Sequence, residues 1–316
     1  MSISEKALRL GMKAVYDYLD RDPAANIPKI LDWLIEHDNG KGVTKQVLAV
    51  REAISNPESN WSKLIMSLWT DIDAGQRKVL FENLVVNGSM IGTPIQTRIS
   101  EQYDCNVPWA ILMDPTSACN LSCTGCWAAQ YGGKSNLSYE TLDSICRQGK
   151  ELGIYFYIFS GGEPLVRKKD IIRLCKEHQD CYFFAFTNGT LVDDELCEDM
   201  LNVGNFALAF SIEGDEEATD MRRGKGTYRK VIEAMERMKA HRLLFGYSTC
   251  YHRYNTESVG SDEFVDDMIA RGCRFSWNFT YIPIGKDART DLLVTPEQRA
   301  YMYRRIREIR DSKPIF

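Results

Sequence analysis

From about residue 109 onward, the chain repeats one pattern: a short run of aromatic and branched apolar residues, then a stretch with helical periodicity. Strands that are apolar almost throughout are buried on both faces, which is typical of a parallel sheet covered by its connecting helices. Six such units predict an α/β fold, a partial (β/α)6 barrel. The expected strands lie at 109–113, 154–160, 182–187, 205–212, 243–250 and 274–282.

The segments between and after these runs are predicted to be helices near 138–152, 168–178, 193–202, 228–241, 257–271 and 296–311. Residues 1–104 differ, because their apolar residues recur at helical spacing without strand-like runs. Glycine and proline interrupt the pattern from Val85 to Val107, where we expect a linker. The predicted organisation is therefore a helical N-terminal domain with its linker at 1–104, and a barrel at 105–316.

Charge and hydropathy exclude several classes of protein. Lys and Arg number 39 against 44 acidic residues, a net charge of -5 that provides no polycationic surface for nucleic acid. No apolar run reaches membrane-spanning length, and residues 1–20 carry charges throughout in place of an apolar signal core. We therefore expect a cytoplasmic protein without a transmembrane segment, in which the 10 cysteines serve ligation and not disulfides.

Three cysteines follow the first apolar run, within the stretch Asp114–Gln130: Cys119, Cys123 and Cys126, at C-x3-C-x2-C spacing. Thiolates this close can face a common centre. A structural zinc site normally takes four ligands, often as two pairs, and the chain has no second pair. An iron–sulfur cube is normally held by four thiolates, so three would leave one iron open to a ligand that reacts.

Polar turns follow the next apolar runs, and in barrels the chemistry lies where strands end. Gly161-Gly162-Glu163-Pro164 follows the second run; its glycines allow close approach of a ligand, and Glu163 can accept from an ammonium group. Asn188 follows the third run, and Ser211 ends the fourth. Each of these segments could also do no more than form a turn after its strand. The cysteines of the later strands, Cys250 and Cys273, are expected to be small apolar core residues.

The cysteine spacing together with Gly-Gly-Glu-Pro resembles the radical S-adenosylmethionine (SAM) superfamily. The resemblance implies a radical SAM barrel in which Cys119, Cys123 and Cys126 hold a [4Fe–4S] cluster, with the amino and carboxylate groups of SAM on the open iron. One departure is Gly125, because the family usually has an aromatic residue before the third cysteine. Trp127 is a candidate to provide that ring.

Further SAM contacts are implied by the same resemblance. In the family, polar strand ends contact the ribose and the methionine carboxylate, and the arginine of an Arg-Gly-x-Gly segment lies near that carboxylate. The matching arginine here is Arg223, in Arg222-Arg223-Gly-Lys-Gly. The predicted cofactor-binding residues are Gly161, Gly162, Glu163, Pro164, Asn188, Ser211 and Arg223.

The implied activity is reductive cleavage of SAM to a 5′-deoxyadenosyl radical that abstracts hydrogen from a substrate, with flavodoxin or ferredoxin as electron donor. A peptide or protein substrate is favoured; such members usually carry a cysteine-rich C-terminal extension, which this chain could lack as a fragment. A lipid or isoprenoid chain is an alternative, suggested by the form of the cysteine motif. A non-enzymatic iron–sulfur or zinc-binding protein is another, although it would need no SAM pocket. The helical domain is expected to pack on the barrel and wall the substrate side.

Overall fold

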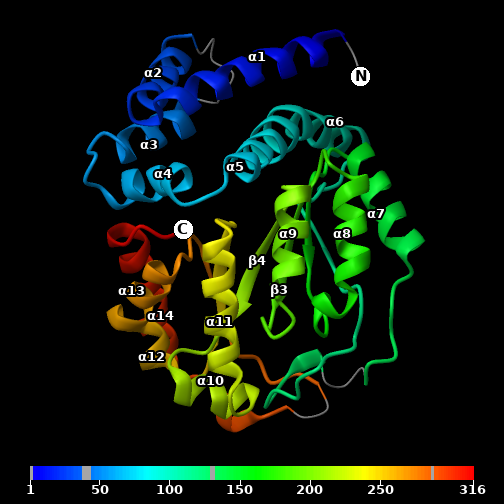
Figure 1. Cartoon of the computed structure of the whole chain (residues 1–316), viewed down its shortest axis with the longest axis vertical. Helices are drawn as coiled ribbons and strands as arrows, with labels where there is room; N and C mark the ends of the chain where they lie inside the picture. Colours follow the sequence, from blue (N-terminus) through cyan, green and yellow to red (C-terminus); the bar gives the residue numbers. More distant parts are fainter. Residues whose placement is uncertain (1–2, 38–43, 129–131, 286–287) are drawn as a thin grey trace.

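The computed structural model describes residues 3–37, 44–128, 132–285 and 288–316 (Figure 1). Its centre is one sheet of six parallel strands in chain order, β1 to β6. Each strand coincides with one of the six predicted runs, and only β5 extends past its run, by one residue: β1 Ile111–Met113, β2 Phe156–Phe159, β3 Tyr182–Thr187, β4 Phe206–Ser211, β5 Phe245–Tyr251 and β6 Ser276–Thr280.

The sheet is curled, because rings from β3 meet rings at β6 although two strands lie between them. The centroids of Phe184 and Phe275 are 5.4 Å apart, and those of Phe186 and Trp277 are 5.5 Å apart. The small residues Ala207 and Ala209 of β4 leave room for these rings on the inner face. The predicted partial (β/α)6 barrel is confirmed.

Helices cover the outer face of the sheet, and Figure 1 shows α8, α9 and α11 side by side along it. The outer core between the two layers is built from fully buried residues such as Phe183, Leu208 and Met235. The bounds are α7 Tyr139–Glu151, α8 Lys168–Glu177, α9 Asp194–Val203, α11 Thr227–Ala240, α13 Asp262–Arg271 and α14 Pro296–Ser312.

Two short helices differ from the predicted pattern. The expected helix at 257–271 is divided into α12 Thr256–Gly260 and α13, because Ser261 caps α13 by accepting from the Phe264 amide at 3.1 Å. An additional helix, α10 Glu216–Arg223, follows β4 and is capped by Asp215. Side-chain capping of this kind is local and can start a helix too short to show a clear apolar period. The tandem arginines lie in its last turn.

Helix continues without a break from residue 74 to residue 103, so the irregular linker expected at 85–107 is mostly helix. Gly92 is needed for packing: a Cβ there would lie 2.4 Å from the carbonyl oxygen of Gly153. Pro94 lies in the first turn of α6, where proline fits a helix. The elements are α1 Ile3–Arg21, α2 Pro23–Glu36, α3 Thr44–Ala53, α4 Asn60–Thr70, α5 Ala74–Leu80, the π-helix η1 Phe81–Gly92 and α6 Thr93–Tyr103.

The last of these helices, from α5 to α6, close the base of the half-barrel at the amino ends of the strands, and α1 lies beyond them (Figure 1). Ile72 joins the inner core with Phe184 and Leu244. Asn83, on η1, donates to the Cys181 carbonyl at 2.8 Å, directly before β3. The Leu244 amide, directly before β5, donates to Gln76 at 3.0 Å. The helices therefore do not wall the substrate side, since they occupy the end of the barrel opposite to it.

Within the described ranges, no helix combines the length and the apolar character needed to cross a bilayer.

Candidate functional site

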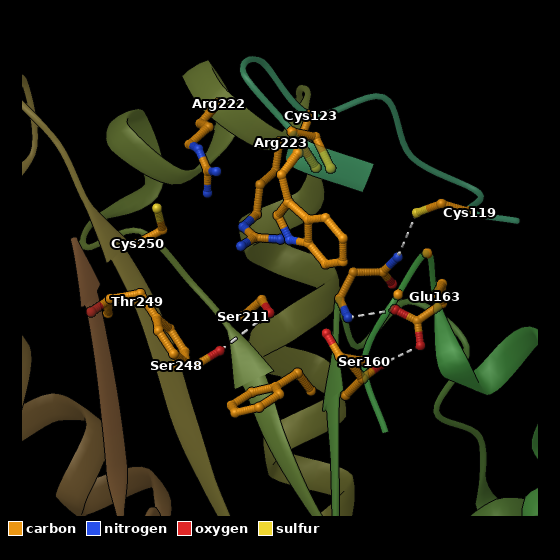
Figure 2. Close-up of a pocket in the computed structure, with 18 of the residues that line it drawn as sticks. Cys119, Cys123, Ser160, Glu163, Ser211, Arg222, Arg223, Ser248, Thr249 and Cys250 are labelled. Carbon is orange, nitrogen blue, oxygen red and sulfur yellow. Dashed lines mark hydrogen bonds between the residues drawn. The ribbon is translucent and has the colours of Figure 1, made fainter. Parts of the chain in front are cut away.

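A cavity of about 280 Å³ opens where the strands end (Figure 2). In the part of the chain that the structure describes, no residue before Leu112 lines it. Its lining comes from the cysteine loop and from strand ends around the whole half-barrel: Leu112, Cys119, Cys123, Cys126, Trp127, Ser160, Gly161, Gly162, Glu163, Phe186, Thr187, Asn188, Ser211, Arg222, Arg223, Ser248, Thr249, Cys250 and Phe279. Of the residues predicted from sequence, only Pro164 does not line it.

The three predicted ligand cysteines all border this cavity. Cys119 is exposed, whereas Cys123 and Cys126 are partly buried. Loss of solvent around the sulfur raises the pKa of the Cys123 thiol and also that of Cys119, although the Cys119 residue as a whole is exposed; the charges of Arg223 and Arg222 oppose the effect at Cys123. As placed, no three His, Cys, Asp or Glu side chains within the described residues are grouped closely enough to hold a metal ion.

The two loops that meet at the cavity are packed backbone to backbone. The Gly162 amide donates to the Thr116 carbonyl at 2.9 Å, and the Glu163 amide donates to the Ala118 carbonyl at 2.8 Å. A Cβ on Gly162 would lie 2.2 Å from the Ala118 oxygen. Gly161 has a φ of +100°, which favours glycine. The glycines therefore permit the close approach of the cysteine loop itself.

Glu163 is 1% exposed, and its carboxylate is held from several sides. One oxygen accepts from the Thr187 hydroxyl at 2.8 Å and from the Leu165 amide at 3.0 Å, and the other accepts from the Asn188 amide at 2.7 Å. Burial raises the pKa of Glu163, although these hydrogen bonds and the charge of Arg223 work against it. Carboxylate oxygens have about four lone-pair sites, so capacity for another donor remains.

Pro164 is buried and begins a short 3-10 helix, Pro164–Arg167, which carries the chain away from the cavity. Asn188 links the end of β3 to the cysteine loop, because its side-chain amide donates to the Asn120 oxygen at 2.8 Å. Ser211 ends the neighbouring strand, β4, and its hydroxyl oxygen is 3.3 Å from that of Ser248 on β5.

The tandem arginines share one buried carboxylate, that of Glu213. Arg223 Nε donates to Glu213 Oε1 at 2.8 Å, and Arg222 pairs with the same oxygen. Burial alone would raise the pKa of Glu213, but the charges of Arg222 and Arg223 outweigh it and hold the pKa below its usual range. Figure 2 shows Arg222, Arg223 and Cys250 on one side of the cavity, and Cys119 and Glu163 on the other.

Cys250 was expected in the core but lines the cavity. Burial raises the pKa of its thiol to about 11, so it is protonated at neutral pH. Sequence reasoning also missed the apolar side of the cavity, formed by Leu112, Phe186 and Phe279. Their signal was available: each comes late in a strand whose alternate residues face inward.

The aromatic ring beside Gly125 is that of Tyr281, which follows the last strand of the sheet. Gly125 has a φ of +68°, and a Cβ there would lie 2.6 Å from the Tyr281 hydroxyl oxygen. Tyr281, directly after β6, therefore packs on this turn of the cysteine loop. Trp127, the candidate considered from sequence, lies 40% exposed on the cavity.

Comparison with known proteins gives one family match: residues 113–259 match the model of the Radical SAM superfamily. Fe-coproporphyrin III synthase of Methanosarcina barkeri is 26% identical over 170 residues, which cover 52% of this chain and 42% of that protein. PqqA peptide cyclase of Granulibacter bethesdensis is 28% identical over 158 residues, which cover 48% of this chain and 42% of that protein. The chain thus matches less than half the length of these relatives.

Among solved structures, native anSMEcpe with bound AdoMet and Cp18Cys peptide superposes with a TM-score of 0.54 and 21% sequence identity. The match covers 64% of this chain and 60% of that one. At this identity the likeness concerns the fold.

Proposed function

Since the chain belongs to the radical SAM superfamily, we propose that it is an enzyme that reductively cleaves SAM and abstracts hydrogen from a substrate. Family membership implies a [4Fe–4S] cluster and SAM. When bound, the cluster supplies the electron, and SAM supplies the 5′-deoxyadenosyl radical, so the difficult chemistry belongs to the cofactors. The protein holds them in place and shields the reaction from water.

The observation that carries this proposal is the donor set of one cavity. Three thiols, the carboxylate of Glu163 and the guanidinium of Arg223 all border it. Thiols are the ligands that iron–sulfur clusters take. The methionine part of SAM carries an ammonium and a carboxylate group, which call for a carboxylate and a guanidinium. By the chemistry of their donor atoms, the residues around this cavity therefore fit both cofactors, although the three thiols as placed are not close enough together to hold a metal ion.

In this proposal Cys119, Cys123 and Cys126 are the cluster ligands, and Glu163 accepts from the ammonium group of SAM. Arg223 faces the methionine carboxylate of SAM from the side of the cavity opposite to Glu163. Asn188 and Ser211 provide polar contacts to the ribose and methionine parts of SAM. Gly161, Gly162 and Pro164 contribute by shaping the loop that carries Glu163. An external donor such as flavodoxin or ferredoxin supplies the electron.

The proposed substrate is a peptide or protein. Two relatives support this class by name, since one is a PqqA peptide cyclase and anSMEcpe was solved with a bound peptide. A lipid or isoprenoid chain is the second candidate, favoured by the apolar side of the cavity at Leu112, Phe186 and Phe279. Deuterium transfer distinguishes them: peptide and lipid fractions from cells grown in deuterated medium are each incubated with enzyme and unlabelled SAM. We expect deuterated 5′-deoxyadenosine from the peptide fraction, and label from the lipid fraction alone would favour the lipid.

The central experiment is anaerobic reconstitution with iron and sulfide, followed by reduction with dithionite in the presence of SAM. The protein should bind about four irons per chain and release 5′-deoxyadenosine. Changing Cys119, Cys123 or Cys126 to Ala should abolish both. Cys105 is exposed and does not line the cavity, so Cys105→Ala is the matched control and should behave as wild type. Full cleavage activity in a Cys123→Ala variant would contradict the proposal.

A further inference from the structure

Glu213 lies behind the cavity and reaches two of its lining elements. It follows the last residue of β4 by two positions and is 0% exposed. One carboxylate oxygen is shared by Arg222 and Arg223, which both line the cavity. The other accepts from the Cys250 amide at 3.0 Å, at the end of β5. A single buried side chain therefore joins β4, α10 and β5.

The same ion group is connected to the cysteine loop. The carbonyl of Arg222 accepts from the Thr124 amide at 2.7 Å, between the second and third cysteines. The Arg222 side chain is 9% exposed, so its direction is fixed by its contacts with Glu213 and not by solvent. The position of α10 over the loop thus depends on the carboxylate beneath it.

Charge balance gives Glu213 a second effect. Two guanidinium groups against one carboxylate leave a single positive charge on this side of the cavity, facing the carboxylate of Glu163 across it. A neutral residue at position 213 would leave two positive charges there, those of Arg222 and Arg223. In a site screened from water, an additional positive charge favours whichever bound state is more negative. Replacement of a buried partner also leaves charges uncompensated, which costs more than the pair contributes.

We propose that Glu213 is a positioning residue: it orients Arg222 and Arg223 toward the cavity, and it sets the net charge beside the cysteine loop. The inference rests on the proposed function, because the charge acts on a bound cluster and on SAM. Its two consequences are separate observables, a reduction potential and a SAM affinity.

The test uses the full chain, reconstituted anaerobically, with Glu213→Gln compared with Glu216→Gln. Glu216 is on the same helix, but its side chain is 58% exposed and pairs only loosely with Arg229 at 3.8 Å. The midpoint potential is followed by electron paramagnetic resonance during a redox titration, and the SAM dissociation constant is measured on iron-loaded protein. For Glu213→Gln we expect a less negative potential, because the excess positive charge favours the reduced cluster. We also expect SAM binding to weaken about tenfold, because Arg223 loses its charged partner.

A second variant keeps the proposal testable if Glu213→Gln folds poorly. In Glu213→Gln/Arg222→Gln the charge balance is restored, so the potential should return toward that of wild type. A purely structural role would lower iron loading and the melting temperature, and leave the potential and SAM affinity of the loaded fraction unchanged. An unchanged potential or an unchanged SAM affinity in Glu213→Gln overturns the proposal, as does a double variant whose potential stays shifted. Failure of the wild-type chain to bind iron or SAM would instead refute the proposed function.

Discussion

Glu163 is the residue on which the proposed SAM site most directly depends. Its carboxylate is placed by Thr187, Leu165 and Asn188, so it is held rigidly before any ligand arrives. Rigid placement matters because a side chain that is already fixed loses little conformational entropy on binding.

Glu163→Ala should leave about four irons bound per chain and weaken SAM binding, since an ammonium group loses a charge-assisted acceptor. Hydrogen bonds to charged groups contribute roughly 1.5–3 kcal/mol, which corresponds to a tenfold to hundredfold loss of affinity. Equilibrium dialysis of iron-loaded protein with labelled SAM measures the change. Glu151→Ala, an exposed carboxylate at the end of α7, is the control. Wild-type affinity in Glu163→Ala would mean that the residue only supports its loop.

Site residues could be predicted where they are close in sequence and missed where they are brought together by the fold. Cys119, Glu163 and Arg223 lie in short, recognisable segments. In the sequence, Cys250 cannot be distinguished from a strand cysteine buried in the core. The curl of the sheet decides whether a residue on the inner face lies in the core or on the cavity. Glu213 gives no signal of its ion pairs in the sequence, because only folding brings the last turn of α10 to its carboxylate.

At the level of elements, the strands were predictable because burial on both faces makes them apolar almost throughout. The helix η1 was not, because Gly88 and Gly92 read as loop residues. The structure uses Gly92 for contact with Gly153. Two buried asparagines of η1 donate to carbonyl groups at the base of the barrel: Asn83 to those of Gln179 and Cys181, and Asn87 to that of Asp180.

Asn83→Ala should lower the free energy of unfolding by about 1–3 kcal/mol, because the Gln179 carbonyl loses a donor and the buried Asn87 amide loses its acceptor. SAM affinity of the loaded protein should stay at the wild-type value, since Asn83 is at the end of the barrel away from the cavity. Urea denaturation monitored by circular dichroism measures the stability. The control is Gln102→Ala, an exposed amide on α6. A stability equal to that of the control would show that η1 is not docked through this residue.

In the whole molecule, the helices that stabilise the sheet and the cavity that holds the candidate site lie at opposite ends of the strands. The helical N-terminal part, which we propose to be a domain, completes the inner core through Ile72, and the cavity lies at the other end of the strands. The apolar stripes of these helices predict a buried face, and the structure provides one. They do not indicate which surface buries that face, so the expected position at the substrate side was wrong.

Ile72→Asp should therefore destabilise the chain without a direct effect on the site. Ile72 is 3% exposed, and an unpaired carboxylate among Phe184 and Leu244 is expected to cost about 3 kcal/mol of unfolding free energy. Differential scanning fluorimetry should report a lower melting temperature, while the fraction that remains folded binds SAM normally. Leu10→Asp, at a side chain that is 70% exposed on α1, should change little. Loss of SAM binding in the folded fraction of Ile72→Asp would argue that the base and the cavity are coupled.

Closure of the base by helices has a practical consequence for handling the protein. Attachment through α1, which carries the exposed Lys13, would place a bead, an electrode or a fluorescent fusion at the end of the molecule remote from the cavity. The strand ends would then face solution. Small reductants and candidate substrates could be exchanged over the immobilised chain by flow, without a linker crossing the entrance.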